Sequence, residues 1–318
     1  MVVLVTGANG QLGQSLQFVA NNYPEIKFVF CDSATLNITD LDNCESVFEK
    51  HKPNFCINAA AYTAVDKAET EIEKAYLINV VGARNLAETC KKYSSILIHV
   101  STDFVFDGTS TVPYLETDLP NPTGVYGQTK LDGEKAIQAT FDNYFIVRTS
   151  WVYSQFGNNF MKTMLRLASE RDSLSVVNDQ VGTPTNAVDL ADVLVKLVIS
   201  DKSLVNSNKF RVNSLESQDT THNPQPTTHN LIPQFGIYNF SNQGQCSWYE
   251  FALEIFRQNN IKIDLKPIPS FQFPTPAKRP SFSVLDKSKI ENLLEIKIKT
   301  WQESLKTVVF SVITENKP

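Results

Sequence analysis

A tyrosine and a lysine lie one helical turn apart in the segment Tyr126-Gly127-Gln128-Thr129-Lys130. Side chains at positions i and i+4 of a helix project from the same face. A phenol titrates near pH ~10, so it exchanges a proton at neutral pH only where a nearby cation stabilises its anion. The pair could therefore be a proton donor with its electrostatic partner. Taken alone, this spacing is a common accident, so the rest of the chain must decide.

A glycine-rich turn follows the first apolar segment, residues 2–6. Gly7 would make the tight turn, Gly10 would let a pyrophosphate approach the backbone, and Gly13 would allow the next helix to pack closely on the strand. The amino terminus of that helix offers amide donors and the positive end of a dipole to phosphates. This strand-turn-helix context predicts dinucleotide binding through Gly7, Asn9, Gly10, Gln11, Leu12 and Gly13.

An acidic residue ends the second predicted strand. Asp32 lies about twenty residues beyond the glycines, where a carboxylate can accept hydrogen bonds from both adenosine ribose hydroxyls. Its charge repels a 2′-phosphate and so favours NADH, although a solvated loop aspartate is the competing interpretation. Further candidates are Asn37 and Ile38 beside the adenine, and Ala59, Ala60 and Ala61, whose small side chains leave room for a cofactor.

Thr102 completes the candidate catalytic group because it ends another strand-like segment, residues 96–101. Ligands meet parallel sheets at the carboxyl ends of their strands. With a nicotinamide cofactor bound there, Lys130 could contact the nicotinamide ribose and lower the pKa of Tyr126. Alone, Thr102 would be interpreted as a helix or turn cap. Together, the three positions predict hydride transfer to a carbonyl group, with Thr102 orienting the substrate oxygen.

Short apolar segments alternate with amphipathic ones, which predicts an α/β fold, a Rossmann-type doubly wound parallel sheet. We assign residues 1–150 to an NAD(P)-binding Rossmann domain, with contributions from about 183–241. Residues 151–182 and 242–318 would form a smaller C-terminal substrate-binding lobe. The predicted strands are 2–6, 28–31, 55–58, 96–101, 144–148 and 237–240, and the predicted helices include 41–51, 71–92, 159–170, 188–200, 247–259 and 301–313.

Residues 201–234 differ from the rest, being rich in Ser, Asn, Thr, Gln and Pro. This composition predicts a polar surface excursion. Asp219, His222 and His229 lie inside it and could form a metal site. Without further ligands we favour a solvated loop, and no metal site is predicted.

The composition excludes several classes of partner. The chain has 318 residues, 29 Lys plus Arg against 34 Asp plus Glu, and no basic block, which argues against nucleic acid and anionic membranes. Its five scattered cysteines predict buried thiols in a reducing compartment. No segment approaches the ~20 apolar residues of a membrane span, and the first segment resembles a buried strand more than a signal peptide. We therefore expect a cytoplasmic protein.

Several segments resemble the extended short-chain dehydrogenase/reductase superfamily. They are the glycine pattern, Asn58-Ala59-Ala60-Ala61, Ser101-Thr102-Asp103 and Tyr126-x-x-x-Lys130. More specific segments are similar to the dTDP-4-dehydrorhamnose reductase family. These are residues 61–69, Arg148-Thr149-Ser150-Trp151-Val152-Tyr153, Gly157-Asn158-Asn159-Phe160 and Arg279-Pro280-x-x-Ser283-x-Leu285. The similarity covers nearly the whole chain except 201–234.

The resemblance implies NAD(P)H-dependent reduction of the C4 ketone of dTDP-4-dehydro-β-L-rhamnose to dTDP-β-L-rhamnose, for dTDP-rhamnose and cell-surface polysaccharide synthesis. It implies that Tyr126 is the proton donor, Lys130 its electrostatic partner and Thr102 a tuning hydrogen-bond donor. It adds Thr63 to the cofactor site. The substrate site would comprise Val65, Thr102, Asp103, Tyr126, Trp151, Asn159 and Arg279, although Trp151 could equally be core packing.

The chain departs from the family pattern at three positions. Ser15 and Val188 stand where some relatives place glutamates of a metal-bridged dimer. This weakens the case for Mg²⁺ and for that dimer, while a homodimer as such stays open. Asn37 replaces a frequent aspartate beside the adenine, so the choice between NADH and NADPH stays open too.

Three other functions share these motifs or this fold. A nucleotide-sugar dehydratase needs an additional acidic pair after the threonine, but Phe104 follows Asp103 here. An epimerase would keep its NAD and consume no reduced cofactor. A non-catalytic regulatory subunit, resembling that of methionine adenosyltransferase, could bind NADP without turnover. The intact set of Thr102, Tyr126 and Lys130 favours catalysis.

Overall fold

A six-stranded parallel sheet forms the centre of the computed structural model, which describes residues 1–200 and 235–315. The predicted excursion 201–234, with Asp219, His222 and His229, lies outside the described residues. The strand order is β10-β5-β4-β3-β1-β2. The strands are β1 (Val2–Thr6), β2 (Lys27–Phe30), β3 (Phe55–Asn58), β4 (Ile96–Thr102), β5 (Tyr144–Thr149) and β10 (Gly236–Asn239).

The order of the strands reverses between β1 and β3, because the chain first adds β2 on one side of β1 and then crosses to the other. In open parallel sheets of this kind, ligands bind outside the carboxyl ends of the strands at the point of reversal. The prediction of a Rossmann-type sheet is confirmed. The glycine turn follows β1, so it lies at this point.

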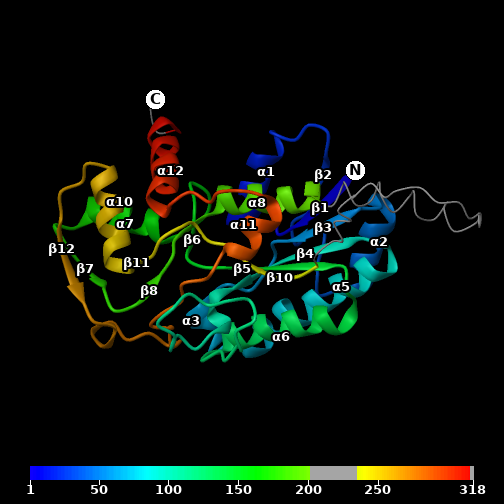
Figure 1. Ribbon diagram of the computed structural model, residues 1–318, viewed down its shortest axis with the longest axis horizontal. Helices are drawn as coiled ribbons and strands as arrows, with labels where there is room; N and C mark the ends of the chain where they lie inside the picture. Colours follow the sequence, from blue (N-terminus) through cyan, green and yellow to red (C-terminus); the bar gives the residue numbers. More distant parts are fainter. Residues whose placement is uncertain (201–234, 316–318) are drawn as a thin grey trace, which may run out of the picture.

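Alternate residues of each central strand are buried on opposite faces, because successive side chains of a strand point in opposite directions. In β1, Val3 and Val5 belong to one core and Leu4 to the other. Figure 1 shows helices on both faces of the sheet. On one face lie α1 (Gln11–Ala20), α8 (Ala187–Ser200) and α11 (Ser288–Leu294), and on the other lie α2 (Leu41–His51), α5 (Gly82–Lys92) and α6 (Val125–Thr140).

The predicted helix 71–92 contains a π-helical turn, η1 (Leu77–Val81), between α4 (Ile72–Tyr76) and α5. Within this turn, Asn79 accepts a hydrogen bond from the backbone N–H of Tyr62 at 2.8 Å. Its amide also donates to the carbonyl of Tyr62 and to the hydroxyl of Thr129 in α6. Single π-helical turns occur often at functional sites. Here the turn fixes the loop after β3 to the helix that carries Tyr126.

A smaller lobe lies beside the carboxyl end of β5, where the chain passes directly into β6 (Val152–Tyr153) (Figure 1). Its core is formed by α7 (Phe160–Glu170), α10 (Trp248–Gln258) and α12 (Trp301–Glu315), around Tyr153 and Phe251. The paired strands are β7 (Ser173–Val177) with β12 (Asp264–Ile268), β8 (Val181–Gly182) with β11 (Cys246–Ser247), and β6 with β9 (Thr185–Asn186).

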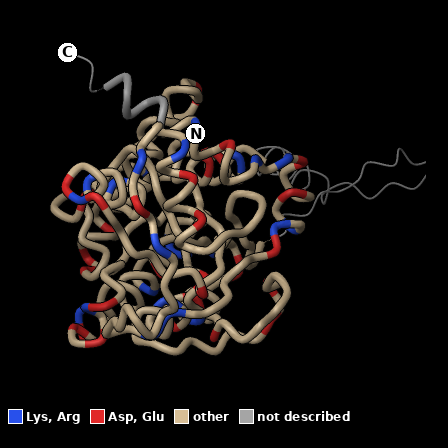
Figure 2. Tube along the Cα trace, turned by 90° about the vertical axis from the view of Figure 1, so that its left-hand side faces the viewer, with Lys and Arg blue, Asp and Glu red and all other residues tan. Residues whose placement is uncertain are grey.

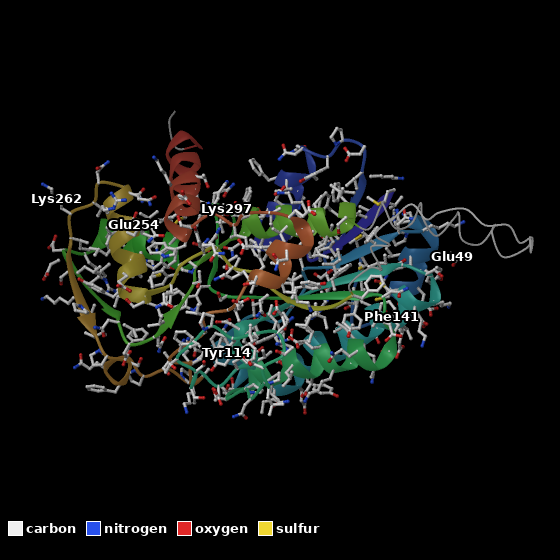
Figure 3. All side chains as sticks on the ribbon, viewed as in Figure 1. Glu49, Tyr114, Phe141, Glu254, Lys262 and Lys297 are labelled. Carbon is white, nitrogen blue, oxygen red and sulfur yellow. The ribbon has the colours of Figure 1, made fainter. Side chains whose placement is uncertain are left out.

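The segment around Tyr114 connects the two parts of the molecule. Its ring stacks on Phe106 at 4.2 Å, and its backbone pairs with that of Leu285. The amide of Asn239 in β10 donates to the Tyr114 carbonyl. Figure 3 shows Tyr114 in the middle of the view, between Lys262 at one end and Glu49 at the other.

Positions of Lys and Arg and positions of Asp and Glu are interspersed along the described part of the trace, without a large block of one sign (Figure 2). The formal net charge of the full chain is −5. All five cysteines are free and buried, as expected. Among the described residues, no helix has the length and apolar character needed to cross a bilayer.

Candidate active site

The turn after β1 has a backbone shape that only glycine fits. Gly7 has φ +65°, and a Cβ added there would lie within 3 Å of backbone atoms of Ala59 and Ala60. A Cβ on Gly13 would lie 2.2 Å from the Gly7 carbonyl oxygen. The prediction that Gly7 turns the chain and Gly13 packs closely is confirmed in geometry. The same turn lies beside the backbone of Ala59 and Ala60.

Helix α1 presents an uncompensated amino terminus at this turn. Gly10 is its N-cap, no side chain caps it, and its first turn holds no acidic residue. Free amides and the positive end of the helix dipole therefore remain available for an anion. The close backbone approach and this donor set fit the pyrophosphate of a dinucleotide. Leu12, also assigned to this site, packs against the core beneath the sheet.

Asp32 lies beside the glycine turn, where its Oδ2 accepts a hydrogen bond from the amide of Asn9 at 3.2 Å. Its Oδ1 accepts from the backbone N–H and the hydroxyl of Thr35, both at 2.9 Å. These hydrogen bonds from Thr35 lower the pKa of Asp32. Asn37 instead accepts hydrogen bonds within its own turn, from Thr39, and Ile38 is buried.

Asn159 lies beside Gln11 at the cofactor turn. It is the N-cap of α7, where its Oδ1 accepts from the backbone N–H of Lys162. Its amide donates to Gln11 Oε1 at 2.8 Å and to the Ser154 carbonyl at 2.7 Å. The sequence assigned Asn159 to the substrate and Gln11 to the cofactor, and the structure brings these two residues together. Asn159 thus joins the smaller lobe to the dinucleotide turn.

Thr102, Asp103 and Tyr126 come together where β4 ends and α6 begins. The Thr102 hydroxyl donates to Asp103 Oδ1 at 3.0 Å and accepts from the backbone N–H of Phe104. This hydroxyl also lies close enough to the phenol of Tyr126 to oppose the rise in the pKa of Tyr126. The Tyr126 ring packs edge-on against Phe104, with ring centroids 5.5 Å apart. Thr102 therefore caps the short helix that follows β4, and its catalytic role stays a prediction.

The pKa of Tyr126 is raised in this structure, and Lys130 is not among the groups that shift it. Desolvation raises this pKa to about 12, and the Asp103 carboxylate adds to the effect. The Lys130 ammonium instead donates to the Val100 carbonyl at 2.7 Å and lies 3.2 Å from His99 Nε2. Its charge is therefore directed toward the backbone of β4. Burial also lowers the pKa of Lys130 to about 8.

Asp103 is a buried carboxyl group at the same site, 2% exposed. Burial raises its pKa to about 6, against the hydrogen bonding of neighbouring hydroxyls. Its Oδ2 is buried and makes no hydrogen bond of normal geometry in the described part of the chain, although the Ser283 hydroxyl lies close enough to oppose the rise in this pKa. A buried acceptor without a partner is costly, so this oxygen is available to a hydroxyl group of a ligand.

Trp151 adopts a left-handed backbone conformation, with φ +46°. Its indole stacks on that of Trp248 with centroids 3.6 Å apart and an angle of 9° between the planes. A Cβ on Gly182 would lie 2.6 Å from the indole, so close packing requires glycine there. The side chain is partly buried. Packing against Trp248 and Gly182 of the smaller lobe therefore fixes the orientation of the Trp151 indole.

Arg279 forms a two-pronged ion pair with Asp66 of α3 (Val65–Ala68). The Nη1–Oδ1 distance is 3.0 Å and the Nη2–Oδ2 distance is 2.8 Å. This hydrogen bonding by Arg279 lowers the pKa of Asp66. The pair joins the smaller lobe to the loop after β3 and brings Arg279 near Val65. Thr63, in the same loop, is exposed.

The sequence analysis missed a buried ion pair between Glu134 and Arg148. The two side chains are each 1% exposed, and Arg148 Nη2 lies 2.7 Å from Glu134 Oε2. Ser101 also donates to Glu134. These contacts hold α6 against β4 and β5. Charged residues in otherwise apolar segments were the available signal, since such residues are rarely buried without a partner.

The described residues contain no group of His, Cys, Asp and Glu that could hold a metal ion. Ser15 is buried and donates a hydrogen bond from its hydroxyl to the Gln11 carbonyl.

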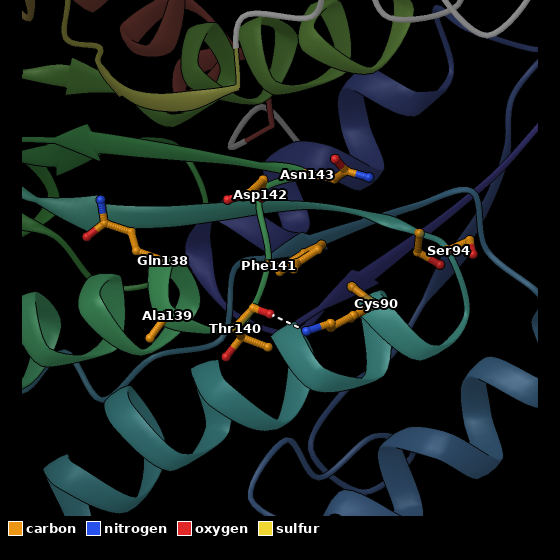
Figure 4. A pocket seen from close by; sticks show the side chains of 10 residues that line it. Cys90, Ser94, Gln138, Ala139, Thr140, Phe141, Asp142 and Asn143 are labelled. Carbon is orange, nitrogen blue, oxygen red and sulfur yellow. Dashed lines mark hydrogen bonds between the residues drawn. The ribbon is translucent and has the colours of Figure 1, made fainter. Parts of the chain in front are cut away.

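A surface hollow of about 380 Å³ lies away from the candidate active site, at the amino-terminal ends of β4 and β5 (Figure 4). Lys91, which lines it, donates to the Thr140 carbonyl. None of the predicted site residues lines this hollow.

Comparison with known proteins places the chain in a family. A family model described as "RmlD substrate binding domain" matches residues 1–313. The dTDP-4-dehydrorhamnose reductase of Aggregatibacter actinomycetemcomitans is 39% identical over 312 residues, 96% of this chain and 97% of that protein. The crystal structure of a dTDP-4-dehydrorhamnose reductase from Clostridium acetobutylicum is 38% identical, with a TM-score of 0.85 over 98% of this chain and 100% of that chain.

A second solved structure carries a cofactor. The dTDP-4-dehydrorhamnose reductase of Bacillus anthracis, in complex with NADP, is 36% identical, with a TM-score of 0.82 over 98% of this chain and 99% of that chain. These similarities extend over the sheet, the glycine turn and the smaller lobe alike. The chain belongs to the dTDP-4-dehydrorhamnose reductase family.

Proposed function

We propose that this protein reduces the C4 ketone of dTDP-4-dehydro-β-L-rhamnose to dTDP-β-L-rhamnose with NADPH or NADH. The observation that carries the proposal is the meeting of Thr102, Asp103 and Tyr126 at the carboxyl end of β4, in a chain of this family. The dinucleotide turn after β1 lies at the same edge of the sheet.

The reduced nicotinamide, when bound, supplies a hydride to C4 of the sugar. The carbonyl oxygen then needs a proton, which Tyr126 gives from its hydroxyl. Thr102, whose hydroxyl lies beside the phenol, would orient that oxygen by turning its hydroxyl from Asp103 to the substrate. The C4 carbonyl becomes a secondary alcohol, and Tyr126 regains its proton from solvent or neighbouring groups.

The raised pKa of Tyr126 suits a proton donor. With a pKa of about 12 the phenol is protonated throughout the neutral range, so the proton is present when the substrate binds. The phenolate left after transfer needs a cation nearby. Lys130 has three N–H donors and uses two, toward Val100 and His99, which leaves one for the phenolate or a ribose hydroxyl of the cofactor.

The remaining substrate contacts follow from the chemistry of the side chains. Asp103 Oδ2 would accept a hydrogen bond from a sugar hydroxyl and so gain a partner. Trp151 would present the outer face of its indole to the apolar side of the deoxysugar. Arg279, at the boundary between the lobes, would contact the diphosphate while Asp66 holds its orientation.

The decisive experiment supplies the 4-keto sugar nucleotide, generated enzymatically, together with NADPH or NADH, and follows the absorbance of the reduced nicotinamide. We expect oxidation of the cofactor and formation of dTDP-L-rhamnose in equal amounts. Absence of oxidation with both cofactors would exclude the reductase, and isomerised sugar without oxidation would indicate an epimerase. Other nucleotide-linked 4-keto-6-deoxysugars serve as specificity controls.

We also infer a cytoplasmic location and leave a homodimer as a prediction. The support for the first is the set of free, buried cysteines. Light scattering of the purified protein at several concentrations would measure the mass in solution, and a mass of twice the chain would support the dimer.

A further inference from the structure

A chain of buried polar side chains runs from Lys130 across the sheet to the cofactor turn. His99 Nε2 lies 3.2 Å from Lys130 Nζ, and His99 Nδ1 lies 3.0 Å from the amide nitrogen of Asn58. Asn58 Oδ1 accepts from the hydroxyl of Thr6 at 2.6 Å. All four side chains are buried, and they come from α6, β4, β3 and β1. Thr6 directly precedes Gly7.

His99 is neutral in this setting. Its side chain is 1% exposed, and burial together with the Lys130 charge holds the pKa of His99 well below its usual range. A neutral imidazole has one donor and one acceptor nitrogen. The ring therefore offers an acceptor either to Lys130 or to Asn58, and a donor to the other.

The protonation of Lys130 selects between these two arrangements. A charged ammonium is only a donor, so it requires an unprotonated Nε2, and the proton on Nδ1 then needs the amide oxygen of Asn58. A neutral amine can accept from a protonated Nε2, and Nδ1 then accepts from the Asn58 amide group. As placed, the Asn58 amide directs its NH2 group at Nδ1, and its oxygen accepts from Thr6 and from the Ala60 backbone N–H. The arrangement with charged Lys130 therefore has this amide turned over, so that its NH2 group donates to the Thr6 hydroxyl and Ala60 donates to that hydroxyl alone. The ring tautomer is thus tied to the charge of Lys130.

We propose that His99 is a positioning residue which keeps Lys130 in its charged form by accepting a hydrogen bond at Nε2. This inference rests on the proposed reductase function, in which the Lys130 charge stabilises the Tyr126 phenolate. The Val100 carbonyl is the other acceptor for the ammonium. Loss of His99 would leave Lys130 buried with this carbonyl alone.

Other charged and titratable groups lie around Lys130 and must be accounted for. On its own helix are Tyr126 and Glu134, and Glu134 raises the pKa of Lys130. Glu134 is itself paired with Arg148 of β5. At the start of α6, Glu69 accepts from the Val125 backbone N–H, and Asp103 lies beside Tyr126. All of these groups are still present when His99 is replaced, so the comparison among His99 variants isolates the contribution of His99 to the titration of Lys130.

Three substitutions separate the roles of the two ring nitrogens. His99→Gln places an amide near the position of Nε2 and can still accept from Lys130. His99→Asn reaches only the position of Nδ1 and keeps the contact with Asn58, while His99→Leu removes both contacts. The comparison of Gln with Asn remains informative if the Leu variant does not fold, because both are uncharged amides.

The first measurement is the pH dependence of kcat/KM. Lys130 must be charged, so activity falls as the pH rises through its pKa, which lies at about 8 in the wild type. We expect the fall in kcat/KM at high pH to move to lower pH by about one to two pH units in the Asn and Leu variants. This shift is what the loss of one hydrogen bond to a charged group would cause. The Gln variant should keep the wild-type pH dependence. A wild-type pH dependence in the Asn variant would overturn the proposal.

The second measurement does not depend on turnover. The ¹³Cε resonance of Lys130 in lysine-labelled protein, assigned with Lys130→Arg, gives the titration of this amine directly. We expect its midpoint to fall in the Asn variant and to stay in the Gln variant. An unchanged midpoint in the Asn variant overturns the role of His99. An inactive wild type whose Lys130 titration follows His99 would instead disprove the reductase function alone.

Discussion

Two aspartates mark the difference between the cofactor end and the reacting end of this site. Asp32 is partly exposed and accepts hydrogen bonds from Asn9 and Thr35, and these lower its pKa. Asp103 is buried, one of its oxygens makes no hydrogen bond of normal geometry among the described residues, and its pKa is raised to about 6. One carboxylate is stabilised by its surroundings, and the other is destabilised by them.

The difference reflects how each end is built. The cofactor end consists of backbone from one continuous segment, residues 7–13, with Asp32 at the next strand end. The reacting end brings together side chains from β4, α6 and the smaller lobe, in a setting from which water is largely removed. Desolvation strengthens electrostatic interactions, so catalytic groups gain from it, but the folded state loses stability.

Removal of the Tyr126 hydroxyl should have the largest effect and should be confined to the reacting end. Tyr126→Phe is expected to lower kcat by roughly 10²–10⁴-fold, the usual contribution of a general acid. The dissociation constant of NADPH, measured by fluorescence, should stay close to wild type. Equal loss of cofactor affinity and turnover would mean that the two ends are not separable.

Substitutions in the glycine turn test the cofactor end of the site instead. In Gly13→Ala the new Cβ would lie 2.2 Å from the Gly7 carbonyl, whereas in Gly10→Ala it would lie 3.2 Å away. We expect overpacking to lower the free energy of unfolding by about 3 kcal/mol in Gly13→Ala, and by less in Gly10→Ala. Titration with NADPH measures the cofactor affinity of the two variants, and thermal unfolding measures their stability. Equal affinity of the two variants for NADPH would refute the geometric account of the turn.

Asp103→Asn should stabilise the protein at neutral pH while it impairs turnover. A carboxyl group whose pKa is raised on folding binds more protons in the folded state, so stability is lost as the pH rises from about 4 to the folded pKa of about 6. The neutral amide avoids this loss, and we expect a gain of about 2 kcal/mol at pH ~7. Urea unfolding of wild type and variant at pH ~4 and at pH ~7 measures this gain in the free energy of unfolding. The gain should vanish near pH ~4, and a gain independent of pH would argue against ionisation of Asp103.

The smallest effect concerns the choice of cofactor. Asp32→Ala removes the carboxylate that repels a 2′-phosphate, so the affinity for NADPH should rise relative to that for NADH by roughly fivefold. Asp40→Ala is a poor control because Asp40 caps α2, whereas Asp42→Asn changes an acid in that helix's first turn without removing its N-cap. The ratio of the two dissociation constants is the measurement. An unchanged ratio in Asp32→Ala would show that the ribose lies elsewhere.

Much of the fold could be predicted because its signals are local. The strands β1, β3, β4 and β5 are apolar runs of four to seven residues, and α7, α8 and α10 end within about two residues of their predicted bounds. The pairing of β7 with β12 was missed, since it joins segments nearly ninety residues apart and β12 contains Pro267. The π-helical turn inside 71–92 was also missed, because its spacing resembles that of an α-helix.

The sequence by itself determined the parallel sheet, the glycine turn and the helical spacing of Tyr126 and Lys130, because each depends on neighbours along the chain. Only the tertiary structure decided how these groups are charged and directed. It turned Lys130 toward His99, stacked Trp151 on Trp248, and paired Arg279 with Asp66. Burial sets a pKa through surroundings that come from distant segments, and no local pattern records them.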